Sequence, residues 1–440
     1  MEKIKNVVFD LGGVLVDLDL NRCIAAFRTL GMDAVAELIN PYYPAEMIGR
    51  LEHGDITFHE ACEEMRRLSG TPDVPDERIA WAYGEFLVTI PVTKLRQIEA
   101  LRRRVEHGVY GYATVPESYY GAVTSWFARR HGWAPGADWI LPVTGVIPAL
   151  SAILRALTRP GDRVLVLTPV YNHFFIAIDN SGCSAAECEL TYGDNRYTVD
   201  FDALERRAAD PAVKLMLLCN PHNPAGRVWT PEELRRIGDI CLRRDILVVA
   251  DEIHCELVMP GFRYTPFASL SEEFARRSVT CASPSKAFNL AGVQVANIFA
   301  ADAGLRERIA RSLEINETGM ISPFAIEALT AAYTDGAEWL DALNGYLWEN
   351  YLFLRDYFAR HLPQFPVLPL EGTYLVWADC RAAGLSSDTL TRRLLDEGRL
   401  HVNSGSMYGA AGEGFIRLNI ACPRKLLAEG LDRLKRVLTT

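Results

Sequence analysis

The stretch "KLMLLCNPHNPAGRVWTPEELRRIGDICLRRDILVVADEIH", residues 214–254, decides the fold of this chain. An apolar run is followed by a loop with two Asn-Pro steps, an amphipathic stretch at 230–244 and a second apolar run at 246–252. This order predicts a strand, a helix and another strand. Similar apolar runs occur at 139–143, 163–169 and 278–284. Strands alternating with helices predict an α/β fold with a mainly parallel sheet.

The bulk properties bound the class of protein. The chain has 440 residues and a formal net charge of −10, which gives no electrostatic footprint for nucleic acid or an anionic membrane. Its start shows no signal-peptide pattern, and Pro, Asp, Asn or His interrupt each apolar run before membrane-spanning length. The ten cysteines form no C-x-x-C pair and are interpreted as buried, reduced thiols. We therefore expect a cytoplasmic protein.

Polar residues follow several of the predicted strands. In sheets of this kind, ligands bind at the carboxyl ends of the strands. Asn220 and Asn223 lie in the loop that the two Asn-Pro steps make rigid, and Asp251 and Glu252 end the next apolar run. A carboxylate at a buried strand end needs a cationic partner. The pattern predicts a ligand site at this edge of the sheet.

A lysine follows a further strand, in "SPSKAFNLAG", residues 283–292. At the sheet edge, the amine of Lys286 could lose water and have its pKa lowered, as Schiff-base chemistry requires, although a solvated surface lysine is the alternative. Another strand ends at Gly145, and an apolar helix begins near Pro148. Free amides at such a helix start can hold an anion, and an ordinary strand-to-helix turn is the alternative interpretation.

The motifs taken in order resemble those of a known enzyme family. They are "GVIPAL", "TPVYNHFF", "CNPHNPAGRVWT", "DEIH", "SPSKAFNLAG", "GTYLVWAD" and "IRLNIACPR". They are similar to fold-type-I pyridoxal-phosphate enzymes with the aspartate aminotransferase-like fold, and most similar to the cystathionine β-lyase (MalY/PatB) branch. The resemblance begins near residue 105. It implies a large cofactor-binding domain over 105–320 and a smaller C-terminal α+β domain over 321–440.

The resemblance also implies a role for each matching residue. Lys286 would bind pyridoxal 5′-phosphate through its amine and then move the proton at the substrate Cα, Asp251 would pair with the ring nitrogen, and Arg417 would clamp the substrate α-carboxylate. The other cofactor contacts would come from Gly145, Val146, Ser283 and Ser285 at the phosphate, Tyr171 on the ring face, and Asn223 and His254 at the phenolic oxygen.

Two further positions concern the phosphate group. Tyr112 would reach across the interface of a homodimer to the neighbour's phosphate. Gln294 stands where many fold-type-I enzymes carry an arginine, so more of the phosphate charge would fall on the helix start.

The reaction implied by the resemblance is β-elimination from a sulfur amino acid such as cystathionine or a cysteine S-conjugate, with release of a thiol, pyruvate and ammonia. Transamination by a class I/II aminotransferase is the alternative, because both reactions begin with loss of the Cα proton. The motifs themselves do not separate the two outcomes. Closeness to the lyase branch favours elimination.

The first hundred residues resemble a different family of enzymes. "VVFDLGGVLVD", residues 7–17, and the stretch 51–70 resemble the first motif and helical cap of haloacid-dehalogenase-type hydrolases, with Asp10 as the nucleophile. The strand expected at 4–10 has no sheet of its own, and the tryptophan-rich segment that precedes "VEHGVYGY" in the lyase branch is not found. We hypothesise that 1–104 is a truncated hydrolase segment fused to the lyase. A Mg²⁺-dependent phosphatase and an inactive cofactor-binding fusion are less favoured alternatives.

Overall fold

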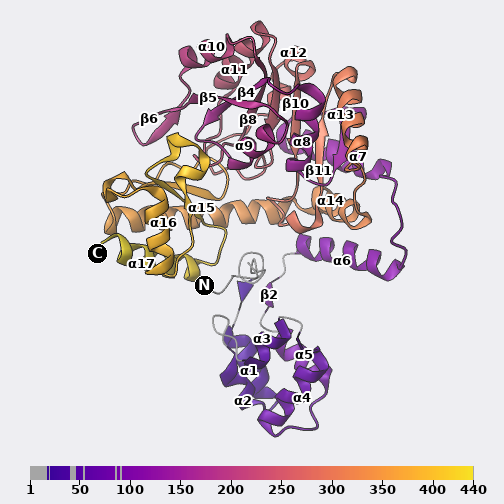
Figure 1. The fold of residues 1–440 in the computed structure, drawn as a ribbon. Helices are drawn as coiled ribbons and strands as arrows, with labels where there is room; N and C mark the ends of the chain where they lie inside the picture. The colour runs from indigo at the N-terminus through magenta and orange to yellow at the C-terminus, as the bar shows by residue number, and fades with distance from the viewer. Residues whose placement is uncertain are drawn as a thin grey trace. The chain divides into compact units, whose positions relative to one another are not determined.

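The computed structural model describes residues 17–18, 20–39, 46–52, 55–84, 87–89 and 92–439. The chain divides into two compact units, Met1–Pro91 and Val92–Thr440 (Figure 1). The boundary predicted between residues 104 and 105 falls inside helix α6 (Val92–His107), which belongs to the second unit. Gln97 and Ala100 of α6 are buried, and the helix packs against α14 (Pro323–Asp335) of the second unit. The basic helix assigned to the front segment is therefore part of the C-terminal unit.

The described part of the first unit is mainly helical. Its elements are β1 (Asp17–Leu18), α1 (Leu20–Thr29), α2 (Asp33–Leu38), α3 (Glu46–Glu52), α4 (Phe58–Ser69), α5 (Asp76–Gly84) and β2 (Leu87–Thr89). Thr57 and Glu60 form a reciprocal capping box at the start of α4, and Phe27, Met65 and Ile79 are fully buried between the helices. Asp10 and the strand predicted at 4–10 lie outside the described residues.

A seven-stranded sheet forms the centre of the second unit. In spatial order its strands are β3 (Ile140–Val143), β11 (Ala296–Phe299), β10 (Ser278–Ala282), β9 (Leu247–Asp251), β8 (Val213–Cys219), β4 (Arg163–Thr168) and β5 (Ser184–Glu189). Only β11 runs antiparallel to its neighbours in this sheet. The predicted mainly parallel sheet is confirmed.

Helices cover both faces of this sheet, which explains why its strands are almost continuously apolar. Along β8, Leu215 and Leu217 belong to one core, whereas Met216 and Leu218 belong to the other. The first core includes side chains from α8 (Val146–Leu157), α9 (Asn172–Asp179) and α13 (Ala303–Ile315). The second includes side chains from α10 (Phe201–Ala208), α11 (Pro231–Arg243) and α12 (Glu272–Arg276).

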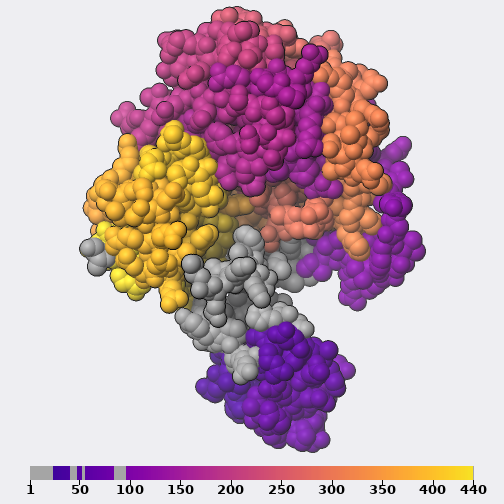
Figure 2. All heavy atoms as spheres, viewed as in Figure 1, coloured from indigo at the N-terminus to yellow at the C-terminus, as the bar shows by residue number. Residues whose placement is uncertain are grey.

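A smaller antiparallel sheet lies in the C-terminal part of this unit, whose residues gather in one lobe, yellow in Figure 2. Its strands are β12 (Leu375–Asp379), β14 (Phe415–Asn419) and β13 (Asn403–Ser404). The other elements are α7 (Glu117–His131), α15 (Ala337–His361), α16 (Ser387–Asp396), α17 (Arg424–Leu438), and the hairpin of β6 (Thr191–Gly193) and β7 (Arg196–Thr198). Short 3₁₀ helices span Ala137–Trp139, Phe267–Ser269, Ala291–Val293, Arg381–Ala383, Gly405–Tyr408 and Ala410–Gly412. The domain boundary at 320/321 stays a prediction.

Among the described residues, no helix combines the length and the apolar character that a membrane crossing requires.

Candidate active site

Three neighbouring strands end at the same level of the large sheet. Asp251, the last residue of β9, is paired in register with Cys219 at the end of β8 and with Cys281 near the end of β10. The loops that leave these ends carry Asn223 and Lys286. The structure therefore brings the ends of these three strands to one carboxyl edge of the sheet.

Asp251 is a buried carboxylate at the end of β9. Asp251 is 2% exposed, and its Oδ1 accepts a hydrogen bond of 3.2 Å from the backbone N–H of Ile253. It forms no ion pair with any residue that the structure describes. Burial raises the pKa of Asp251 to about 6, although the Ile253 N–H and the charge of Lys286 oppose this rise. A positive charge beside this buried carboxylate would therefore stabilise its ionised form.

Lys286 lies close enough to Asp251 to interact with it electrostatically. Burial lowers the pKa of the Lys286 amine, the Asp251 carboxylate raises it, and Arg417 lowers it further, with a net fall. The turn before it is fixed because the Ser283 hydroxyl donates to the carbonyl oxygen of Val295 (2.6 Å) and accepts from the N–H of Ser285 (3.0 Å). The amine is thus held at the sheet edge in a state closer to neutral than that of a solvated lysine. The predicted phosphate contacts of both serines stay predictions.

Arg417, on β14, is held by neutral partners. Its two terminal nitrogens donate to Oδ1 of Asn223 and to Oδ1 of Asn403, each at 2.9 Å, and its guanidinium carbon lies 5.0 Å from the ring centre of Tyr408. No carboxylate among the described residues pairs with it, and its buried Nε has no partner there. The full charge of Arg417 is therefore available to an anionic ligand.

The sequence did not reveal Asn403 and Tyr408 as part of this arrangement. Asn403 reaches Arg417 because β13 and β14 pair these two residues in register. Such a register across a long connection is not visible in the sequence. Asn223 was predicted to face a cofactor oxygen; its Oδ1 contacts Arg417, and its amide nitrogen keeps its donors for that predicted role.

Aromatic residues complete the walls of the site. Burial, together with Lys286 and Arg417, lowers the pKa of His254 to about 3, and its Nδ1 has no partner in the described part of the chain. The ring of Tyr374, which the sequence reading missed inside "GTYLVWAD", meets His254 edge-on at 5.9 Å. Burial, with Asp251 nearby, raises the pKa of Tyr171 to about 12. His254 and Tyr171 are thus neutral side chains near the charged groups.

Helix α8 begins at Val146, with Gly145 at its N-cap. No side chain caps this end, so the first amides are left for a ligand. A Cβ atom at residue 145 would lie 3.3 Å from Cδ of Pro148, which is a tight contact. Tyr112, by contrast, is 95% exposed, and the single chain does not bring it into the site.

Glu252 behaves differently from the prediction. The sequence suggested that it needs a cationic partner, yet the fully buried carboxyl group accepts hydrogen bonds from the Tyr264 hydroxyl and the N–H of Phe267. Burial raises its pKa to about 8, so it is largely protonated at neutral pH. Neutral donors satisfy Glu252, and Asp251 alone brings negative charge to the site.

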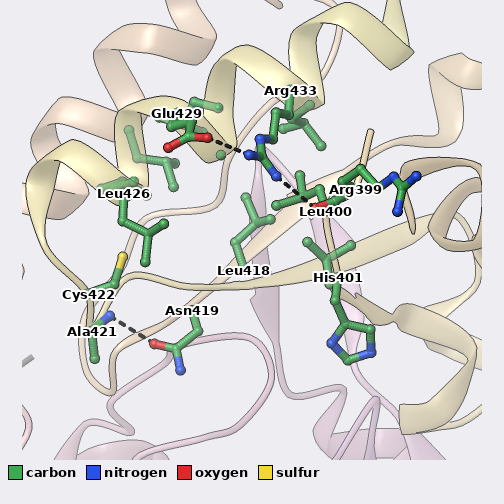
Figure 3. A pocket seen from close by; sticks show the side chains of 16 residues that line it. Arg399, Leu400, His401, Leu418, Asn419, Ala421, Cys422, Leu426, Glu429 and Arg433 are labelled. Carbon is green, nitrogen blue, oxygen red and sulfur yellow. Dashed lines mark hydrogen bonds and ion pairs between the residues drawn. The ribbon is translucent and has the colours of Figure 1, made fainter. Parts of the chain in front are cut away.

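One further cavity, of about 340 Å³, lies between α17 and β14 (Figure 3). Leucine side chains line much of it, with Cys422 and His401 in its wall. None of the residues described above as site residues contributes to its lining. This cavity is therefore separate from the candidate site around Asp251 and Lys286.

Comparisons with known proteins show the family of the chain. The family model described as "Aminotransferase class I and II" matches residues 77–434. The chain is 41% identical over 341 residues to cystathionine beta-lyase PatB of Bacillus subtilis, covering 78% of this chain and 88% of that protein. It is 32% identical to protein MalY of Escherichia coli, with coverage of 77% and 86%.

Solved structures show the same fold. Cystalysin from Treponema denticola, whose structure contains a pyridoxal 5'-phosphate cofactor, superposes with a TM-score of 0.76 at 36% identity, covering 78% of this chain and 87% of that one. The PLP-bound C-S lyase from Staphylococcus hominis gives a TM-score of 0.75 at 30% identity, with coverage of 79% and 90%. The hydrolase resemblance of residues 1–104 and the fusion receive no support, and the family match begins inside that segment.

Proposed function

Because the chain belongs to the family of class I and II aminotransferases, we propose that it is a pyridoxal 5′-phosphate-dependent carbon–sulfur β-lyase. Its substrate would be a sulfur amino acid such as cystathionine or a cysteine S-conjugate. The observation that carries the proposal is the 41% identity to a cystathionine beta-lyase over most of both chains. Asp251 and Lys286 at the edge of the large sheet, and Arg417 on β14 of the small sheet, would supply the charged groups that this chemistry needs.

The residues present fit the cofactor. Asp251 is a buried carboxylate with no ion pair among the described residues, and the protonated ring nitrogen would be a cationic partner for it. The amine of Lys286, with its lowered pKa, would bind the aldehyde carbon. The uncapped start of α8 behind Gly145 would hold the phosphate. The unpartnered Nδ1 of His254 is a further polar atom in this wall that a ligand could satisfy.

When bound, the cofactor supplies an electron sink for the bonds at the substrate Cα. Arg417 then holds the substrate α-carboxylate, which fixes the position of Cα beside the amine of Lys286. The lowered pKa of Lys286 favours the neutral amine, which is the form that would accept the Cα proton. As that proton leaves, the Cβ–S bond breaks and the sulfur departs with the bonding electrons as a thiolate, which takes up a proton to become the thiol. The unsaturated product is hydrolysed to pyruvate and ammonia.

Transamination is the competing function, supported by the family description and by 28% identity to the putative aminotransferase YugH of Bacillus subtilis. The two functions differ in their need for a second substrate. We expect the purified holoenzyme to release pyruvate from cystathionine with no keto acid present, and Lys286→Ala to abolish this release. Turnover that requires a keto-acid acceptor would identify an aminotransferase instead.

A homodimer with shared sites is part of the proposal. Tyr112 is 95% exposed, and Val105, Val109 and Tyr110 beside it are also exposed, which is unusual for apolar side chains unless a partner covers them. If Tyr112 acts in the neighbour's site, each site takes Lys286 from one chain and Tyr112 from the other chain. Tyr112→Phe and Lys286→Ala would then remove residues that different chains contribute to the same site. Mixing the two variants after unfolding would restore activity in heterodimers, whereas no recovery would place both residues in the same chain's site.

The cysteines support the proposed cytoplasmic location. All ten are free, and nine are buried. Chains with many reduced thiols and no disulfide are typical of reducing compartments.

A further inference from the structure

A second cluster of reactive side chains lies outside the proposed cofactor site. His131 is the last residue of α7, and Cys255 and Glu256 follow β9 in the chain. One ligand-type atom from each of the three lies within 4.8 Å of the others. Cys255 and Glu256 are buried, and the side chain of His131 is 8% exposed. The three residues share the lining of a cavity of about 260 Å³ that includes none of the residues assigned to the cofactor.

The carboxylate of Glu256 is held on one oxygen only. Its Oε1 accepts a hydrogen bond of 2.6 Å from Nε1 of Trp126 and lies 2.8 Å from Nε2 of His131 and 3.7 Å from Sγ of Cys255. Its Oε2 is buried and has no partner in the described part of the chain. A buried carboxylate oxygen without a hydrogen-bond donor is unfavourable, and a bound ligand would satisfy it.

Asn344 provides a second oxygen of the same kind. Its amide nitrogen donates to the backbone carbonyl of Glu256 at 2.9 Å, which fixes the amide group. Its Oδ1 is buried and lacks a partner among the described residues, and Asn344 lines the same cavity. Two buried acceptors without donors, beside an imidazole and a thiol, are better satisfied by a cation than by another acceptor.

We propose that His131, Cys255 and Glu256 bind a divalent transition-metal ion of the zinc type. The ligands are Nε2 of His131, Sγ of Cys255 and Oε2 of Glu256, and Asn344 Oδ1 or a water molecule completes four-fold coordination. A nitrogen, a thiolate and a carboxylate oxygen are a donor set that zinc accepts. A thiolate and a carboxylate together also balance the two positive charges of the ion.

Metal binding would replace the hydrogen bond between His131 and Glu256 and would remove the thiol proton of Cys255. The hydrogen bond between His131 and Glu256 is replaced by bonds from both residues to the ion, while Trp126 continues to hold Oε1 and so orients the carboxylate. Burial and the nearby carboxylates keep the pKa of the Cys255 thiol well above its usual value, so binding releases the thiol proton to solvent.

Two cations in the cavity wall have partners outside the cluster, and the charge of Arg130 also lowers the pKa of Glu256. Arg129 donates to the carbonyl oxygen of Tyr333 at 3.0 Å, and Arg130 pairs with Asp341 at 2.8 Å. Arg263, also in the wall, is exposed. Because Cys255 follows His254 directly, an ion here would fix the segment that carries Asp251 and His254, and would attach it to α7.

The test uses Co²⁺ as a spectroscopic probe of the purified, chelator-treated holoenzyme under reducing, oxygen-free conditions. We expect one Co²⁺ per chain to produce ligand-field bands in the red part of the visible spectrum, away from the cofactor band, and Zn²⁺ to remove them. His131→Gln and Cys255→Ser should each weaken binding at least about tenfold. Cys422→Ser, in the separate cavity of Figure 3, should leave binding unchanged.

Co²⁺ binding that is unchanged by every substitution in the cluster, or no Co²⁺ binding at all, would overturn the proposal. The cofactor absorption and the thermal midpoint of each variant show whether it is folded. Glu256→Gln provides a second variant of almost the same shape, and it should also lose Co²⁺. Since the readout is metal binding, it is independent of whether the enzyme proves to be a lyase.

Discussion

Replacing Asp251 with asparagine should stabilise the cofactor-free protein and weaken its hold on the cofactor. The folded-state pKa of about 6 lies above the ordinary value of 3.8 because the carboxyl group is buried. The carboxylate therefore opposes folding above about pH 6, and this penalty disappears as the pH falls below 3.8. A difference of two pK units between the folded and unfolded states lowers the free energy of unfolding by about 3 kcal/mol at pH 8. About half of this destabilisation remains at pH 5. Asparagine removes the charge and keeps an acceptor for the N–H of Ile253.

Urea denaturation of the cofactor-free protein at pH 8 and pH 5 measures this effect. Asp251→Asn should raise the free energy of unfolding at pH 8, with a smaller gain at pH 5, whereas the exposed control Asp179→Asn should change neither value. The same variant, titrated with pyridoxal 5′-phosphate, should bind it more weakly. A variant that is less stable than the wild type at pH 8, or equally altered at both pH values, would refute the account of a buried charge that awaits a cation.

Two other variants test the surroundings of the site. Glu371→Ala removes a buried partner of Arg227, 3.0 Å away, and should lower the free energy of unfolding by about 3 kcal/mol, the low end for such pairs because Glu233 still contacts Arg227; urea denaturation measures the loss. Asn403→Ala releases one side of Arg417 and should raise KM for the amino-acid substrate more than it lowers kcat, as steady-state kinetics would show, with an unchanged cofactor spectrum.

The sequence predicted the parts of the site that adjoin the strand ends. Asp251 and Lys286 follow apolar runs directly, and parallel strands bring their carboxyl ends to one edge, so local pattern was enough. The helix start at Val146 was visible for the same reason.

Other parts depend on tertiary packing that no local pattern encodes. Asn403 and Tyr408 reach Arg417 only through the register and folding of the small sheet. Glu252 looked like a charged residue in the sequence, but its neighbours are the neutral donors Tyr264 and Phe267, which lie more than ten residues further along the chain. The division at 91/92 was not visible in the sequence, because α6 is a polar helix whose buried side, including Gln97, packs against α14.

The identity of the lysine that carries the cofactor tests the central claim most directly. Borohydride reduction of the holoprotein makes the bond between the amine and pyridoxal 5′-phosphate permanent, and peptide mass mapping then locates it. We predict that the cofactor mass is found on the peptide that contains Lys286 and is absent from Lys286→Ala. A cofactor adduct on another lysine, or an unmodified Lys286 in a protein that shows the cofactor band, would contradict the account.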